Sequence, residues 1–266
     1  MNELTRRILF AIPAGALFLY LIWVGGIAFQ ALTAFIALMV LVEMLRMFRN
    51  LTYPAYSLLA ILIAVVLWTF PYQPAWGIMT ASAIFIIATL WALVNRSKTI
   101  SNRWFITLFC GLYAPLGMLF FYLVRESGAD EAGLWLSYTL ILMIWGNDIF
   151  AYFGGRSFGK TPLAPKISPK KTWEGFWSGF AGAFIGLLIV YWIADPYPVS
   201  MIAALPMIAL VSVFGPAGDL TASRLKRVTG IKDSSNLLPG HGGFLDRFDS
   251  LIICAPIVYI YIQWLI

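Results

Sequence analysis

The stretch LWLSYTLILMIWGNDIFAYF, residues 134–153, decides the fold of this 266-residue chain. Most of its side chains are apolar, and it is as long as the roughly 20 helical residues that a bilayer core about 30 Å thick requires. Similar windows recur along the whole chain, at residues 8–24, 27–45, 56–70, 76–94, 104–124, 134–153, 176–194, 201–214 and 251–265. The sequence therefore predicts an all-α, polytopic integral membrane protein with about nine transmembrane helices.

The composition excludes the other broad classes of protein. The chain is 61% hydrophobic and only 11% charged, whereas a soluble domain carries about 25% charged residues to solvate its surface. Its net charge of +6 would indicate a nucleic-acid partner in a soluble protein. In a membrane protein the same charge is first explained by topology, so we expect no nucleic-acid partner.

The positions of the basic residues orient the chain. With the N-terminus in the cytoplasm, all of the 18 Lys and Arg residues except Arg125 fall on inner segments. Cytoplasmic loops of membrane proteins carry such an excess, and adding or removing one span would scramble it. This clean bias, together with short tails, favours a bacterial inner (cytoplasmic) membrane with the active site on the cytoplasmic side.

The polar residues divide the chain into two regions. Residues 1–130, with about five spans, contain no polar constellation beyond short basic loops, and we interpret them as a scaffold bundle. Residues 131–266, with about four spans, form the predicted catalytic region. Its cytoplasmic loops are expected at residues 154–175 and 215–250.

The first of these loops carries a pair of lysines. Ser168 followed by Pro169 predicts a helix N-cap with proline at the first position, which places Lys170 and Lys171 in the first turn. Because a helix N-terminus disfavours cations, two lysines there indicate a bound anion, such as a phosphate. The alternative is a solvated basic loop on anionic lipid.

The second loop is rich in acidic residues. Asp246 and Asp249 are three residues apart, so on a helix that begins there they share one face. With Asp219 at the end of the previous span, they suit Mg²⁺, which binds few carboxylates and keeps water or phosphate ligands. The alternative is that these carboxylates only complement a helix dipole.

Two single residues also attract attention. Asp148 lies near the inner end of the sixth span, where a carboxylate is costly enough to indicate function, with the following lysines or the metal as partners. A packing hydrogen bond with Asn147 would be the structural alternative. His241, the sole histidine, either binds phosphate or a ligand between its glycine neighbours or is simply solvated.

Three segments resemble the signature of the phosphatidate cytidylyltransferases, also called CDP-diacylglycerol synthases. The longest reads Ser223-x-Leu225-Lys226-Arg227, four residues, Lys232-Asp233, Pro239-x-His241-Gly242-Gly243 and Asp246-Arg247-x-Asp249. The others are Asp148-x-x-Ala151-Tyr152 and Ser168-Pro169-Lys170-Lys171-Thr172-x-Glu174-Gly175. The resemblance covers residues 146–250.

This resemblance implies that the cytidylyl group of CTP is transferred to phosphatidate, giving CDP-diacylglycerol and pyrophosphate, with Mg²⁺ and in some members a second cation. The candidate catalytic residues are Asp219, Asp246, Lys226 and Asp148, and the candidate metal ligands are Asp219, Asp246 and Asp249. The candidate substrate-binding residues are Lys170, Lys171, Ser168, Ser223, Arg227, Lys232, His241, Gly242, Gly243 and Arg247. Ala222 stands where the family pattern is expected to have a glutamate, which predicts a one-metal or altered site.

Two other functions stay open, and so does a homodimer. A CTP-dependent lipid kinase would use the same nucleotide and metal but transfer the γ-phosphate and release CDP. A polytopic transporter would place its charges near the midplane and often shows an inverted repeat. Against the transporter, most acidic residues here cluster at one membrane face and no such repeat is apparent.

Overall fold

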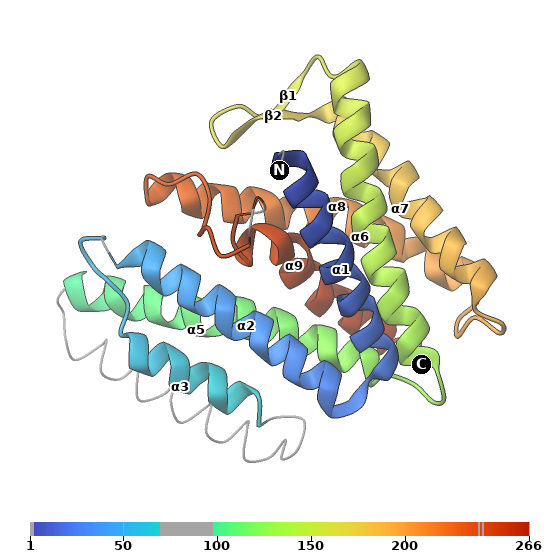
Figure 1. Ribbon diagram of the computed structural model, residues 1–266, viewed down its shortest axis with the longest axis horizontal. Helices are drawn as coiled ribbons and strands as arrows, with labels where there is room; N and C mark the ends of the chain where they lie inside the picture. Colours follow the sequence, from blue (N-terminus) through green and yellow to red (C-terminus); the bar gives the residue numbers. More distant parts are fainter. Residues whose placement is uncertain (1–2, 50, 70–97, 239, 241, 266) are drawn as a thin grey trace.

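The computed structural model describes residues 3–49, 51–69, 98–238, 240 and 242–265. Most of these residues are helical (Figure 1). The helices are α1 (Glu3–Val24), α2 (Gly26–Phe48), α3 (Ser57–Leu67), α5 (Lys98–Arg125), α6 (Ala132–Phe158), α7 (Trp173–Ile193), α8 (Met201–Val228) and α9 (Leu245–Ile262). The strands β1 (Pro162–Ala164) and β2 (Ser168–Thr172) form a small antiparallel hairpin between α6 and α7.

The helices confirm the prediction of a polytopic, all-α membrane protein. Five segments are long and apolar enough to cross a membrane: α2, residues Asn102–Arg125 of α5, α6, α7 and α8. The apolar part of α1, Leu9–Val24, and α3 are shorter. The predicted span at residues 76–94 lies outside the described residues, so the number of nine spans stays a prediction.

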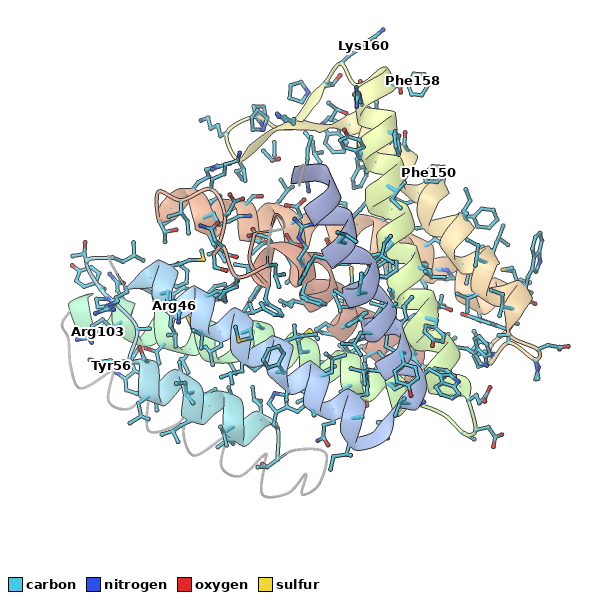
Figure 2. The ribbon with its side chains drawn as sticks, viewed as in Figure 1. Arg46, Tyr56, Arg103, Phe150, Phe158 and Lys160 are labelled. Carbon is cyan, nitrogen blue, oxygen red and sulfur yellow. The ribbon has the colours of Figure 1, made fainter. Side chains whose placement is uncertain are left out.

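The outer surface of the bundle is apolar. Ile27 and Ile202 are each 82% exposed and Trp192 is 80% exposed. Phe150 and Phe158 point outward from α6 (Figure 2). Such broad exposure of large apolar side chains is rare on a soluble monomer, where it would favour aggregation. It is the surface that a helix bundle presents to lipid.

Glycines bring α6 and α7 into backbone contact, and the two helices lie side by side in Figure 1. A Cβ atom on Gly146 would collide with the carbonyl of Gly182, and one on Gly186 would collide with the carbonyl of Leu142. Small residues allow membrane helices this close approach. The contact fixes the part of α6 that carries Asp148.

A second set of glycines positions α9 between α5 and α8. A Cβ on Gly117 of α5 would lie 2.5 Å from the carbonyl oxygen of Ile252. A Cβ on Gly218 of α8 would collide with the carbonyl of Asp249. Because Asp219 follows Gly218 directly, this contact brings Asp219 of α8 close to Asp249 of α9.

The predicted loop at residues 215–250 is wrong in its first part. Helix α8 continues to Val228 and includes Pro216, although proline removes a backbone donor and usually ends a helix. Here Pro216, Gly218 and Ala222 are buried, and the Ser250 hydroxyl donates to the carbonyl of Gly215 at 3.0 Å. Packing against α9 therefore overrides the local signal, and the connecting segment begins only at residue 229.

The predicted helix start at Ser168 is also wrong. Ser168 pairs with Ala164 in the hairpin, so Lys170 and Lys171 lie on strand β2 and not in the first turn of a helix. Helix α7 begins at Trp173, where the Thr172 hydroxyl accepts a hydrogen bond from the Gly175 N–H at 3.2 Å. Threonine is a good N-cap, and its signal here prevailed over that of the Ser-Pro pair.

Candidate active site

Side chains from four elements meet at one end of the bundle. Asp219 of α8 forms an ion pair with Lys171 of β2, with Nζ and Oδ2 2.6 Å apart. Asp249 of α9 lies within electrostatic range of Asp219, Lys171 and Asp148 of α6. We call Asp148, Asp219 and Asp249 the open carboxylates, because few protein groups bond to them.

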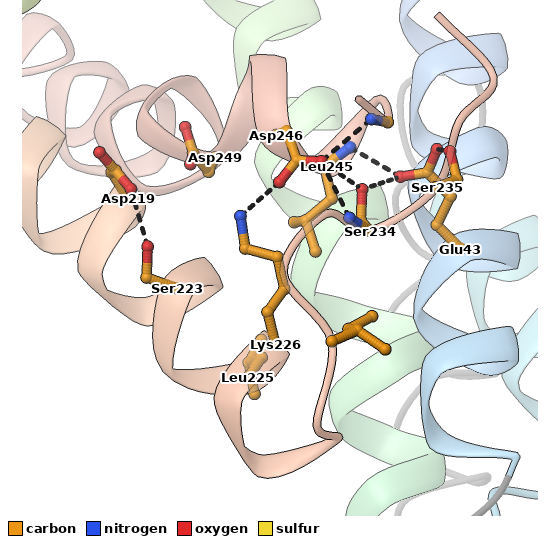
Figure 3. Close-up of polar contacts among 12 residues, drawn as sticks. Glu43, Asp219, Ser223, Leu225, Lys226, Ser234, Ser235, Leu245, Asp246 and Asp249 are labelled. Atoms are coloured by element: carbon orange, nitrogen blue, oxygen red, sulfur yellow. Dashed lines mark hydrogen bonds and ion pairs between the residues drawn. The ribbon is translucent and has the colours of Figure 1, made fainter. Parts of the chain in front are cut away.

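Each open carboxylate has a different environment. Asp219 also accepts a hydrogen bond from the Ser223 hydroxyl at 3.1 Å, one helical turn away (Figure 3). Asp249 is only 8% exposed, and its side chain accepts a local hydrogen bond from the N–H of Ser250 at 2.7 Å. A buried carboxylate with so little compensation is costly unless a cation joins it.

Asp148 lies on the exposed side of α6, within electrostatic range of Lys171 and Asp219. Asn147 beside it is buried, and its amide finds no hydrogen-bond partner in the described part of the chain. The alternative in which Asp148 makes a packing hydrogen bond to Asn147 therefore receives no support, and the predicted proximity of Asp148 to a lysine of the following loop is found.

Asp246 belongs to a separate network (Figure 3). Its Oδ1 pairs with the ammonium group of Lys226. Its Oδ2 accepts from the Ser234 N–H and hydroxyl, each at 2.9 Å, and from the Gly243 N–H at 3.0 Å. Both oxygens are thus occupied by protein donors. We call Asp246, Lys226 and Ser234 the closed network.

The structure therefore divides the three predicted metal ligands. Helix α9 begins at Leu245, six residues before the predicted span 251–265, so Asp246 and Asp249 do lie on one helix. The two carboxylates nevertheless have different partners. Across the described ranges, no three Asp, Glu, His or Cys side chains are arranged to hold a metal ion. Mg²⁺ does not require three, because it often takes one or two carboxylates and completes its shell with water and phosphate oxygens. Asp219 and Asp249 fit that requirement better than Asp246.

A cavity of about 410 Å³ lies beside the closed network. A Cβ on Gly242 would approach the Asp246 Oδ2 to 2.7 Å, and the backbone φ angles of Gly240 and Gly242 are positive, at 73° and 79°. Only glycine adopts such angles without strain. The cavity is lined by Lys232, Asp233, Asn236, Leu238, Gly240, Gly242 and Arg247.

Three predicted substrate-binding residues, Lys232, Gly242 and Arg247, thus share this cavity, whose volume is typical of a small-molecule site. Arg227 is exposed and donates to the carbonyl of Ile231 at 3.4 Å. Lys170 is exposed on β2, and Ser168 is partly buried there. His241 lies outside the described residues.

The sequence analysis missed one residue, Glu43 of α2. Its side chain is fully buried and bonds to residues 234, 235, 244 and 245, close to Asp246. The signal was present in the sequence, because Glu43 is the one acidic residue in the predicted span 27–45. The rule that drew attention to Asp148, that intramembrane carboxylates indicate function, applies equally to Glu43.

Comparison with known proteins identifies the family. The model of the cytidylyltransferase family matches residues 5–265 of the chain. The chain belongs to this family. The match covers both halves of the chain, so it extends well beyond the residues 146–250 that carry the sequence signature.

Several relatives of this cytidylyltransferase-family protein carry the name phosphatidate cytidylyltransferase. The Bacillus subtilis protein is 35% identical over 97% of this chain and 97% of its own length. The Brucella abortus protein is 34% identical over 98% and 94%, respectively. The Pseudomonas aeruginosa protein is 36% identical over 76% and 74%.

Proposed function

We propose that this chain transfers the cytidylyl group of CTP to phosphatidate, forming CDP-diacylglycerol and pyrophosphate. One structural observation carries the proposal: carboxylates and cations from α6, β2, α8 and α9 gather at one end of membrane helices. A lipid phosphate and a water-soluble nucleotide can meet at such a place. The family membership and the names of the relatives support the same activity.

The reaction needs no dedicated general base. The second pKa of a phosphate monoester is about 6, so the phosphate of phosphatidate is mostly dianionic near neutral pH. It can attack the α-phosphorus of CTP directly, and the bond to the β-phosphate breaks as pyrophosphate leaves. The tasks of the protein are then to align two anionic substrates and to offset their charge.

The cations of the site suit these tasks. Lys232 and Arg247 line the cavity, which supports a role in holding the nucleotide phosphates. Lys171 faces the open carboxylates and is placed to contact a phosphate there, with Asp148 nearby. Lys170, Ser168, Arg227, His241 and Gly243 stay predicted contributors to substrate binding.

We assign Mg²⁺ to Asp219 and Asp249, with the remaining ligands from water and substrate. When bound, the ion would neutralise charge on the reacting phosphates. Asp246, a predicted ligand, is better suited to positioning Lys226, because four protein donors bind its oxygens, whereas Asp219 has one donor on each oxygen. A second cation would have to do without a ligand from Ala222, which is buried in α8.

The distribution of Lys and Arg supports a cytoplasmic N-terminus and a site on the cytoplasmic side of a bacterial inner membrane. Phosphatidate would then enter from the inner leaflet and CTP from the cytosol. The apolar outer face of α7 is available to lipid or to a second copy of the chain, and the mass of the solubilised particle distinguishes these two.

The decisive experiment supplies the detergent-solubilised protein with phosphatidate, labelled CTP and Mg²⁺. Formation of CDP-diacylglycerol and pyrophosphate, abolished by a chelator, is the expected result. Release of CDP with a phosphorylated lipid would assign the chain to the lipid kinases. A folded sample without turnover would overturn the proposal, and uptake of a solute by vesicles that contain the protein would point to a transporter.

A further inference from the structure

Glu43 is an acidic residue placed in an apolar part of the bundle. It lies in α2 among the buried side chains of Val40, Leu41, Met44 and Met47, and its own exposure is 0%. Burying a carboxylate costs several kcal/mol unless hydrogen bonds replace the lost water. The contacts of Glu43 should therefore reveal why the position is acidic.

Both oxygens of Glu43 accept two hydrogen bonds each (Figure 3). Oε1 accepts from the Ser235 hydroxyl at 2.6 Å and from the Phe244 N–H at 2.9 Å. Oε2 accepts from the Ser234 hydroxyl at 2.8 Å and from the Leu245 N–H at 2.9 Å. All four donors belong to the segment that ends in the first turn of α9.

Two of these bonds cap a helix from a distance. The first N–H groups of any helix lack partners within it and favour negative charge. In α9, the N-cap residue Phe244 provides no side-chain cap, and the carboxylate of Glu43 replaces it. Gly243 leaves room for this approach, because a Cβ there would lie 2.5 Å from both Glu43 oxygens.

The other two bonds come from the hydroxyls of Ser234 and Ser235. Ser234 belongs to the closed network and Ser235 does not. The Ser234 hydroxyl lies 2.8 Å from Glu43 Oε2 and 2.9 Å from Asp246 Oδ2, so its single proton is shared between the two carboxylates. Asp246 in turn binds Lys226. The Ser235 hydroxyl donates to Glu43 and accepts from the Leu237 N–H. Within the described residues it makes no hydrogen bond to Asp246.

We propose that Glu43 is a positioning residue for the cytidylyl transfer proposed above. It acts through Ser234 and the start of α9 to fix Asp246 and, through Asp246, the ammonium group of Lys226, a candidate catalytic residue. It touches neither substrate. This inference rests on the proposed function and assigns a role in the reaction to a helix of the predicted scaffold half.

The test compares two serines that both bind Glu43. Ser234→Ala removes the hydroxyl that bridges Glu43 and Asp246 but keeps the backbone N–H bond of residue 234 to Asp246. The matched control Ser235→Ala removes a hydroxyl that bonds to Glu43 and not to Asp246. We expect kcat to fall about tenfold in Ser234→Ala, with a smaller change in Ser235→Ala. Equal kcat values in the two folded variants would overturn the proposal.

Glu43→Gln provides the second comparison, with Thr33→Val as its control. Thr33 is also buried in α2, but its hydroxyl binds only backbone carbonyls of the same helix. The NH₂ group of a glutamine would face donors that need an acceptor, so at least one pair of the hydrogen bonds would be lost. We therefore expect kcat to fall about tenfold to a hundredfold in the folded fraction. Glu43→Asp should recover part of that loss. A purely structural residue would lower the yield of folded protein and leave the kcat of that fraction unchanged.

A double-mutant cycle tests whether Glu43 acts through Lys226. In a Lys226→Met background, Glu43→Gln should lower kcat by less than twofold, because the group it positions is gone. If kcat of the double variant falls by the product of the two single-variant losses, the proposal is overturned. If the wild-type protein makes no CDP-diacylglycerol, the proposed function fails by itself. Hydrogen exchange then tests the connection from Glu43 through Ser234 to Asp246. Ser234→Ala should increase exchange of the Gly243 N–H more than Ser235→Ala does, and equal protection in the two variants would refute the connection.

Discussion

The two acidic groups of the site differ in how completely the protein binds them. In the closed network, Asp246 accepts from three protein donors on one oxygen and pairs with Lys226 on the other. Among the open carboxylates, Asp249 is more deeply buried than Asp246, yet it is compensated by a local N–H and, through electrostatics, by Lys171. The comparison separates a carboxylate that is fully bonded within the protein from one that has few protein donors.

The largest expected effect follows from removing a charge among the open carboxylates. Asp249→Asn should lower kcat about a thousandfold, because the variant loses a metal ligand at the reacting phosphates. The measurement is CDP-diacylglycerol formation per folded molecule. The control is Asp195→Asn, which changes an exposed aspartate in the connection between α7 and α8. Near-normal turnover by Asp249→Asn would remove the distinction between the two groups.

In the closed network, the same substitution should act on stability. Asp246→Asn leaves the ammonium group of Lys226, whose side chain is 11% exposed, without its partner. Breaking a buried pair in this way costs about 3 kcal/mol, so the melting temperature of the solubilised protein should fall clearly, together with kcat. An Asp246→Asn protein as stable as the wild type would mean that the network does not hold the α8–α9 junction.

Two neighbouring lysines of β2 give a smaller effect. Lys171 pairs with Asp219, whereas Lys170 is exposed. We expect Lys171→Ala to lower kcat about tenfold to a hundredfold, since it removes a positive charge that would lie beside the reacting phosphates. Lys170→Ala should mainly weaken binding to anionic vesicles. A larger loss of kcat in Lys170→Ala than in Lys171→Ala would contradict the assignment of Lys171 to the reacting phosphates.

The smallest effect is a stabilisation by the metal. At ten times its dissociation constant, Mg²⁺ should stabilise the folded protein by about 1.4 kcal/mol, which thermal unfolding can detect. Asp249→Asn should abolish this shift and Asp246→Asn should retain it. A shift that survives in Asp249→Asn but disappears in Asp246→Asn would place the metal in the other group.

The sequence predicted the features that depend on short-range pattern. Hydropathy located the membrane helices of the described residues, although α9 begins at Leu245, six residues before the predicted span 251–265. Local signals failed where tertiary packing decided the outcome. Pro216 did not end α8, because Gly218 and Ser250 allow α8 and α9 to pack closely. Ser168 did not begin α7, because the hairpin placed the N-cap at Thr172.

The separation of the open carboxylates from the closed network could not be predicted. It depends on which donors reach Asp246, and these come from residues 226, 234 and 243, on a helix and a connecting segment. Glu43 lies still further away, 191 residues before Ser234. Periodicity identifies one face of a helix, but it does not identify the partner that this face meets.

The bond between α2 and the start of α9 also bears on how the protein is made. Synthesis of the chain reaches α2 well before α9, so Glu43 enters the membrane before the segment that carries its hydrogen-bond donors has been made. Until the Phe244 and Leu245 N–H groups arrive, its carboxylate lacks two of the four donors that it has in the finished bundle. The arrival of α9 therefore relieves a burial cost that was incurred when α2 was inserted, which couples assembly of the site to docking of α9 against α2.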